Sequence, residues 1–244
     1  DDAVDVDASD LRIDAAVGAG ELGASINPIE TTVGTVSARA ASGGISLHET
    51  DALSVDTTSA SVNRVATDAT TDEVKDVAQS DARTTGGSGS IVIRVATGSL
   101  TVNDTAAPSD GTAVNAHGDG SVLLETLDGS ITANADVGSG SGPITVLAST
   151  NVEFTSEADV VTGNSGTIDL EASSGSISLA TDADQTTGSG DVRLLADTDI
   201  TLGGTITTSG AVSLTTNTGT IYDGDSDDAV DVDASDLRID AAVG

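Results

Sequence analysis

The sequence contains no cysteine, methionine or tryptophan, and only one phenylalanine (Phe154) and one tyrosine (Tyr222). Without cysteine, the chain can form neither disulfides nor thiolate metal sites, and cysteine catalysis is excluded. Aromatic side chains normally supply much of the area buried in a compact core, so a core here must be built from valine, isoleucine, leucine and alanine. No apolar run is long enough to cross a bilayer and no signal peptide is recognisable, so we expect no membrane insertion in this segment.

Basic residues are also scarce. Eight lysines and arginines stand against 40 aspartates and glutamates, which gives a net charge of −32. Such a surface repels nucleic acid and anionic membranes and favours cations as partners. High net charge is also typical of disordered chains, but 37% of the residues are hydrophobic, and their regular pattern predicts a folded protein without a nucleic-acid partner.

An exact internal repeat organises the chain. Residues 1–18 and 227–244 are both DDAVDVDASDLRIDAAVG, which defines a period of 226 residues. Repeats of this kind indicate arrays of structural modules. We therefore predict that residues 1–226 are one complete module and that residues 227–244 are the first coil of the next identical module. The expected partners are neighbouring identical modules, joined end to end in one chain or fibre.

Short apolar segments recur within the module. From residue 91 onward, segments with alternating apolar residues come in pairs whose starts lie eight or nine residues apart, such as 91–93 and 100–102, with Gly, Ser, Asn and Asp between them. This pattern is typical of an all-β parallel β-solenoid, in which each coil lies on the one before. We predict nine coils, whose first strands begin near residues 4, 36, 62, 91, 122, 144, 168, 192 and 212. The pattern is weakest at 62–85, where charged residues indicate an exposed bulge.

A stack of β-sandwich domains is the structural alternative. Sandwich domains have about 100 residues, longer strands and usually an aromatic core. The short strands and the near absence of aromatic residues favour the solenoid.

Three stretches, 204–221, 166–179 and 27–36, resemble the repeats of filamentous-haemagglutinin-like giant bacterial exoproteins and adhesins. The resemblance extends over most of the chain and is poorest at 56–90 and 103–118. It implies a right-handed parallel β-helix, secretion across the cell envelope, an extracellular or cell-surface location, and a role in adhesion, biofilm or surface fibres. The motifs are degenerate, so the resemblance supports the architecture better than a specific activity.

The clearest candidate site is an acidic loop at the module junction, which contains Asp223, Asp225, Asp227 and Asp228. Calcium takes six to eight oxygen ligands, which short Asp/Gly loops can supply. The spacing begins like an EF-hand loop, but loop position 6 is Asp228 instead of Gly, and position 12 is Ala234 instead of Glu. A calcium site and a solvated acidic loop both remain open, with calcium as the one expected cofactor.

Parallel β-helices also host polysaccharide-degrading enzymes, which need clustered carboxylates in a cleft. Only Asp169 and Arg193 are predicted to be stacked neighbours of opposite charge, and a surface ion pair explains them. The two histidines, His48 and His117, have no serine or cysteine nucleophile motif beside them. We therefore do not expect an enzyme.

These observations predict a structural, non-catalytic tandem-repeat module of an extracellular fibre or adhesin stalk that forms a rigid acidic rod. The alternative is a receptor- or glycan-binding module that uses the loops 15–34, 56–90 and 103–118. A polysaccharide-degrading β-helix enzyme fits less well. Lateral contacts between fibres or with surface glycans are further expected interactions.

Overall fold

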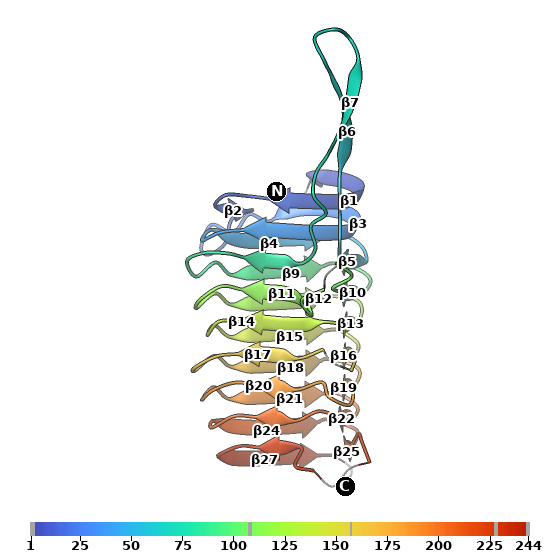
Figure 1. Ribbon diagram of the computed structural model, residues 1–244. Coiled ribbons are helices and arrows are strands. Elements are labelled where there is room, and N and C mark those ends of the chain that lie inside the picture. The colour runs from blue at the N-terminus through green and yellow to red at the C-terminus, as the bar shows by residue number, and fades with distance from the viewer. Residues whose placement is uncertain (1–2, 107–108, 157, 227–228, 243–244) are drawn as a thin grey trace.

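The computed structural model describes residues 3–106, 109–156, 158–226 and 229–242 (Figure 1). These residues form an all-β parallel β-solenoid, as predicted. Twenty-five strands belong to one parallel sheet that winds around the axis, and two more form a separate antiparallel hairpin. The part of the chain that is described includes no helix long and apolar enough to cross a membrane.

The strands stack in three columns, which we call A, B and C. Column A contains β2 (Gly18–Ala19), β4 (Gly44–Glu49), β9 (Ile91–Val95), β12 (Val122–Thr126), β15 (Ile144–Ala148), β18 (Ile168–Ala172), β21 (Val192–Ala196), β24 (Ala211–Thr216) and β27 (Asp236–Ala241). Column B contains β5 (Leu53–Val55), β10 (Leu100–Val102), β13 (Ile131–Ala133), β16 (Val152–Phe154), β19 (Ile177–Leu179), β22 (Ile200–Leu202) and β25 (Ile221–Asp223). Column C contains β8 (Ala82–Thr84), β11 (Thr112–Ala116), β14 (Asp136–Ser139), β17 (Val160–Thr162), β20 (Gln185–Thr186), β23 (Ile206–Thr207) and β26 (Val232–Asp233).

Two longer strands near the N-terminus run through more than one column. β3 (Ile29–Ala40) pairs in turn with β4, β5 and β8, so it bends from column A through B to C without a break. β1 (Val6–Asp14) lies on β3 along almost its whole length. Counting β1 as the first coil, nine coils precede β27 in the described residues, which confirms the predicted number.

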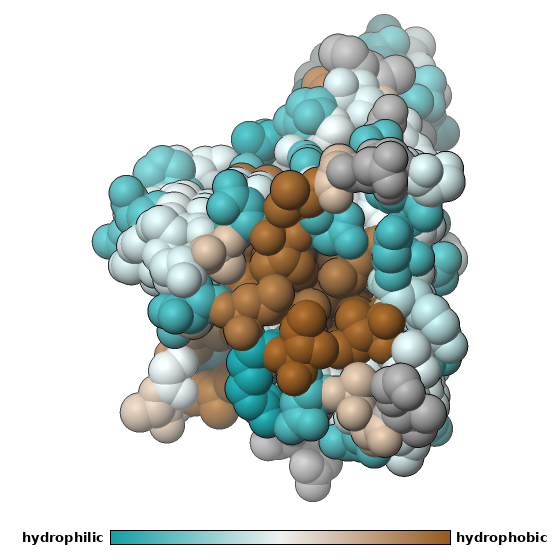
Figure 2. Space-filling model, turned by 90° about the horizontal axis from the view of Figure 1, so that it is seen from below, coloured by the Kyte–Doolittle hydropathy of each residue, from teal (hydrophilic) through white to brown (hydrophobic). Residues whose placement is uncertain are grey.

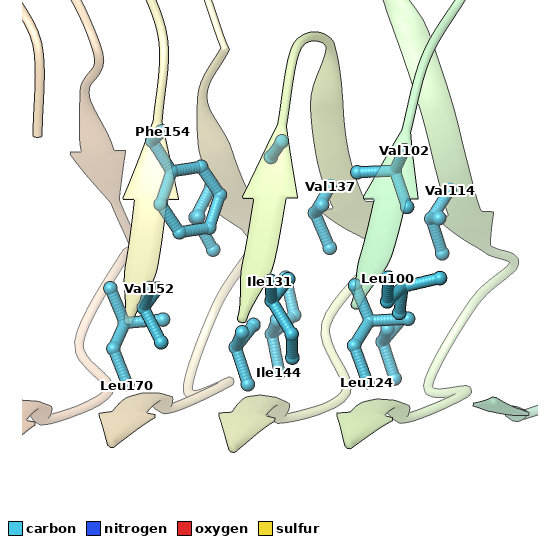
Figure 3. Packing of buried hydrophobic residues seen from close by; sticks show 14 of the residues in the cluster. Leu100, Val102, Val114, Leu124, Ile131, Val137, Ile144, Val152, Phe154 and Leu170 are labelled. Carbon is cyan, nitrogen blue, oxygen red and sulfur yellow. The ribbon is translucent and has the colours of Figure 1, made fainter. Parts of the chain in front are cut away.

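Alternation along each strand builds the core. In β9, the side chains of Ile91, Ile93 and Val95 are buried, whereas the residues between them are partly exposed, as the two-residue period of a strand requires. Seen along the axis from below, apolar residues fill the interior and polar residues surround them (Figure 2). Aliphatic side chains from the three columns interdigitate there, and Phe154 is fully buried among them (Figure 3).

A ladder of hydroxyl groups stabilises the corner where column C leads into column A. The Oγ1 of Thr162 donates to the carbonyl oxygen of Gly142 in the preceding coil, at 2.8 Å. The same contact recurs along the axis between Ser139 and Gly120, Thr187 and Gly166, and Thr208 and Gly190. Glycine is required beneath this ladder because a Cβ on Gly190 would lie 1.8 Å from the carbonyl oxygen of Gly166.

Two of the predicted coil starts are wrong. Residue 36 lies inside β3, where it pairs with β5 of column B, because that strand continues through the corner at Gly34 instead of ending there. Residue 62 lies in β6 (Ser61–Val65), which pairs antiparallel with β7 (Thr71–Lys75) outside the solenoid. The coils in question begin with β2 and β4 instead. The short strands of column C were also largely missed.

The two identical 18-residue segments adopt different strand divisions. In the first copy, residues 6–14 form one strand, and Leu11 pairs with Val36 in the coil that follows. In the second copy, the equivalent residues are divided between β26 and β27, and Leu237 pairs with Val212 in the coil that precedes. The same strand is therefore observed with a neighbour on one edge in the first copy and on the other edge in the second.

Candidate functional site at the corner between columns B and C

Two insertions lie at this corner in successive coils. Residues 56–81 connect β5 to β8, and residues 103–111 connect β10 to β11. They touch, since Nδ2 of Asn103 donates to Oδ2 of Asp56 at 3.2 Å and Oγ1 of Thr105 donates to Oδ1 of the same residue. The structure thus brings together parts of two of the three predicted binding loops, 56–90 and 103–118, although the second also contains strand β11.

The third predicted loop, 15–34, is only partly a loop. It contains β2 and the beginning of β3, and besides residues 15–17 its irregular part is 20–28, closed by an antiparallel bridge between Glu21 and Asn27. That part follows β2 in column A, so it belongs to a different segment of the coil.

A hairpin projects from the corner. In it, Val62 pairs with Val74, Asn63 with Glu73, and Arg64 with Asp72. Every residue of β6 is exposed, as are most of those of β7. The hairpin runs along the solenoid axis and extends beyond the coil that contains β1 (Figure 1). The predicted exposed bulge is therefore an ordered hairpin with its own cross-strand pairing.

The base of the hairpin is packed on the preceding coils. Thr58 and Gln79 form an antiparallel bridge across the two legs. Oγ1 of Thr58 lies 2.6 Å from Oγ of Ser37 in β3, and Nε2 of Gln79 donates to the carbonyl oxygen of Ile13 in β1 at 2.7 Å. These contacts cover Ser37 completely and direct the hairpin toward the N-terminal end of the solenoid.

Asp81, just before β8, is the most perturbed acid at this corner. Its side chain lies beside a cavity of about 10 Å³ that Arg83, Asp110, Thr112 and Asn115 also line. Only 6% of Asp81 is exposed, and its Oδ1 is buried without a hydrogen-bond partner among the described residues. Burial raises the pKa of Asp81 to about 6, helped by the charges of Asp104 and Asp110 and opposed by a hydrogen bond from Ser80 and by Arg83.

A ladder of aspartates continues down the same corner, through Asp136, Asp159 and Asp184. Oδ1 of Asp136 accepts the backbone N–H of Asp159 at 2.9 Å, and Oδ1 of Asp159 accepts that of Asp184 at 2.8 Å. Oδ1 of Asp184 accepts the N–H of Thr205 at 2.7 Å. Burial, together with neighbouring carboxylates, raises the pKa of Asp136 and of Asp159 despite these bonds. These carboxylates thus tie successive coils together.

The predicted calcium ligands are only partly described. Asp223 ends β25, and its Oδ1 accepts the backbone N–H of Asp225 at 3.1 Å. Asp227 and Asp228 lie outside the described residues. Within the described ranges no group of three or more His, Asp or Glu side chains is placed to hold a metal ion. Calcium at this junction stays a prediction.

The predicted stacking of Asp169 and Arg193 is confirmed. Nε of Arg193 lies 2.7 Å from Oδ1 of Asp169, and its Nη2 lies 2.8 Å from Oε2 of Glu171. The hydrogen bond with Asp169 is the main reason that the pKa of Arg193 is raised. His48 lies in β4 of column A, whereas His117 follows β11 of column C, where its Nδ1 lies 2.8 Å from the carbonyl oxygen of Gly87.

No protein-family model matches this chain, and no curated protein or solved structure matches it either. The resemblance to filamentous-haemagglutinin-like repeats therefore stays a prediction, and the function must be argued from the geometry.

Proposed function

We propose that this chain is a non-catalytic structural module, repeated in tandem, that builds a rigid acidic rod in an extracellular fibre or adhesin stalk. The main support for this proposal is the strand sequence that occurs in both copies of the 18-residue repeat. One copy pairs with the coil after it, through Leu11 and Val36, and the other pairs with the coil before it, through Leu237 and Val212. A strand with this sequence can thus carry a neighbour on each edge, which is what a solenoid needs to continue from one module into the next.

The apolar residues of the second copy support the same proposal. Leu237 is 49% exposed and Ile239 is 58% exposed, although their partners Val212 and Leu214 are buried. The equivalent Leu11 and Ile13, which have β3 beside them, are packed against the core. A following coil would bury Leu237 and Ile239 in the same way, and full burial of such side chains contributes roughly 1.5–3 kcal/mol each. The stack then behaves as a one-dimensional array of coils coupled to their neighbours.

The charge of the module fits a rod that stays separate from others. The 244-residue chain has a net charge of −32, of which residues 227–244 contribute −5, so parallel rods of such modules repel one another at low salt. Divalent cations such as calcium would reduce this repulsion, with the loop at 223–228 as the proposed binding segment.

A receptor- or glycan-binding role is the second candidate. It is favoured by the two insertions that meet at the B–C corner and by the projecting hairpin. A polysaccharide-degrading role is less favoured, because Asp136, Asp159 and Asp184 already accept backbone N–H groups of the following coil. Binding of soluble glycans to the intact chain, measured by calorimetry and abolished by changes within 103–111, would support the second candidate over the first.

The rod is tested with a chain of two modules, in which residues 1–226 are followed directly by residues 1–244. Nine coils about 4.8 Å apart give about 43 Å per module, so we expect a single straight particle whose stacked coils of the two modules extend over about 86 Å in small-angle scattering and electron microscopy, with the hairpin of the first copy projecting beyond them. We also expect its unfolding midpoint to exceed that of the 244-residue chain. Two compact particles joined at variable angles would overturn the proposal.

A further inference from the structure

We infer that the β6–β7 hairpin is a clasp that binds along the outer surface of the preceding module copy. This inference rests on the proposed tandem array, and its partner is a second copy of this same sequence. A two-stranded hairpin alone is marginally stable in water, yet this one exposes Val62, Val65 and Val77 by 62%, 68% and 84%. An ordered hairpin with exposed valines calls for a partner surface.

The repeat itself determines which surface lies beside the hairpin. In the second copy, residues 237–239 stack on residues 212–214 of column A. In the first copy, the identical residues 11–13 have residues 36–38 stacked on them, and these pair in turn with strands of columns B and C. Column A of one module therefore continues into the B–C side of the next. A second register agrees: Val232 follows column C, whereas the identical Val6 is followed by Thr31, which pairs with Glu49 of column A. Each junction thus displaces the columns by about one position.

The outward side chains can be followed across the junction. Ser37, which the hairpin base covers, pairs with Arg12, and Arg12 is equivalent to Arg238. Arg238 pairs with Ser213, and the same row continues through Arg193, Asp169 and Thr145. The hairpin leaves its base in line with this row, so in an array it meets the outer face of column A of the preceding copy.

The hairpin is long enough to reach several coils of that copy. Thr58 lies at the same position along the solenoid axis as β3, because it contacts Ser37; positions along this axis are called levels below. Nine residues separate Thr58 from the turn near residue 67, and at about 3.3 Å per residue they span about 30 Å. Since coils are about 4.8 Å apart, the hairpin passes β1 and extends over the coils of β24, β21, β18 and β15.

A charge and an apolar pair match the levels that this spacing predicts. Successive residues of a strand point to opposite faces, so Val62 and Arg64, with their partners Val74 and Asp72, lie on one face of the hairpin. Arg64 lies about 20 Å above Thr58, close to the level of β18, which carries Asp169 and Glu171. Val62 and Val74 lie about 13 Å above Thr58, close to the level of β21. With this face toward the preceding copy, the Arg64 guanidinium faces carboxylates and the two valines face the solenoid surface.

The clasp is tested by distance measurements between spin labels in the two-module chain, which is possible because the sequence has no native cysteine. The clasp pair is Asn63→Cys in the second copy and Thr145→Cys in the first. The junction pair is Thr101→Cys in the second copy and Thr201→Cys in the first. We expect a narrow distance distribution for both pairs. The clasp distribution should broaden severalfold with Arg64→Glu in the second copy and stay unchanged with the matched control Arg39→Glu, which lies outside the hairpin.

The outcomes separate the two proposals. A narrow junction distribution with a broad clasp distribution overturns the clasp and leaves the rod standing. Broad distributions for both pairs overturn the rod, and the clasp with it. A clasp distribution that stays narrow with Arg64→Glu contradicts the charge matching on which the docked position depends.

Discussion

Replacement of Asp81 by asparagine should stabilise the protein at neutral and higher pH. The carboxyl is almost completely buried, one of its oxygens has no hydrogen-bond partner among the described residues, and its pKa is raised to about 6 from a usual value of 3.8. A raised pKa means that the folded state binds the proton more tightly than the unfolded state. The contribution of Asp81 to stability is therefore fully present below pH 3.8 and is lost as the pH rises through about 6.

The size of the effect follows from the difference between the two pKa values. At 1.36 kcal/mol per unit, a shift from 3.8 to about 6 corresponds to roughly 3 kcal/mol above pH 7. The substituted amide would have no charge to desolvate, and asparagine tolerates the positive φ of 70° found at this position. We expect Asp81→Asn to raise the free energy of unfolding by about 1–3 kcal/mol at pH 8 and by much less at pH 4.

Urea unfolding of both proteins between pH 4 and pH 8 measures this difference directly. Asp128→Asn, which removes an exposed carboxylate from a loop, is the matched control and should shift stability equally little at all pH values. Equal stabilities of Asp81→Asn and the parent chain at pH 8 would show that the Asp81 carboxylate is not desolvated. A loss of stability in the variant at pH 8 would show that the charge itself is required at this corner.

Substitutions at Glu49, Thr162 and Gly190 test the contacts that hold the coils together. Glu49→Ala should lower the free energy of unfolding by at least about 3 kcal/mol, since the buried carboxylate accepts hydrogen bonds from the hydroxyl of Thr31 and from three backbone N–H groups. Glu49→Gln should lower the free energy of unfolding by less, and chemical denaturation of the two variants measures the difference. Thr162→Val, which leaves the carbonyl of Gly142 without its hydroxyl donor, should cost about 1–3 kcal/mol, and an unchanged urea midpoint would contradict the role of the hydroxyl ladder. Gly190→Ala should lower the melting temperature more than Gly86→Ala, because a Cβ at Gly190 meets a backbone oxygen at 1.8 Å whereas one at Gly86 meets only the Cβ of Ala41, at 4.0 Å.

Columns A and B could be predicted because their signal is local. Each strand of column A from β9 to β21 places apolar residues at alternate positions, and the strand of column B follows after a short polar turn. Alternation of this kind is a property of the strand itself, so it can be found without knowledge of the neighbours. The predicted contact between Asp169 and Arg193 followed from the same register and is confirmed.

Column C could not be predicted in this way because its strands depend on their neighbours. β20 is Gln185–Thr186 and β23 is Ile206–Thr207. Two residues cannot show a period, and the buried position is held by a polar residue, Gln185, in one strand and by an apolar one, Ile206, in the other. The hairpin could not be predicted for a different reason: the valines at 62, 65, 74 and 77 do not alternate as strand residues do, and only the cross-strand pairing shows that 61–65 and 71–75 are antiparallel strands. Asp81 carries no sequence signal at all, since its pKa depends on burial between its own segment and the segment 103–115 of the next coil.

The duplicated segment shows how much of this fold is determined by neighbouring coils. With identical residues, one copy forms the single strand β1 and the other is divided into β26 and β27. Local propensity is the same in both copies, so the difference must come from the neighbouring coil on which each copy is paired. The first copy pairs with β3, which bends through three columns without a break. The second copy pairs with β23 and β24, which lie in separate columns. In a tandem array the same strand would lie between both templates at once. The junction is then where the cross-section of the rod changes, and a hairpin that spans it would add contacts where the stacking is least regular.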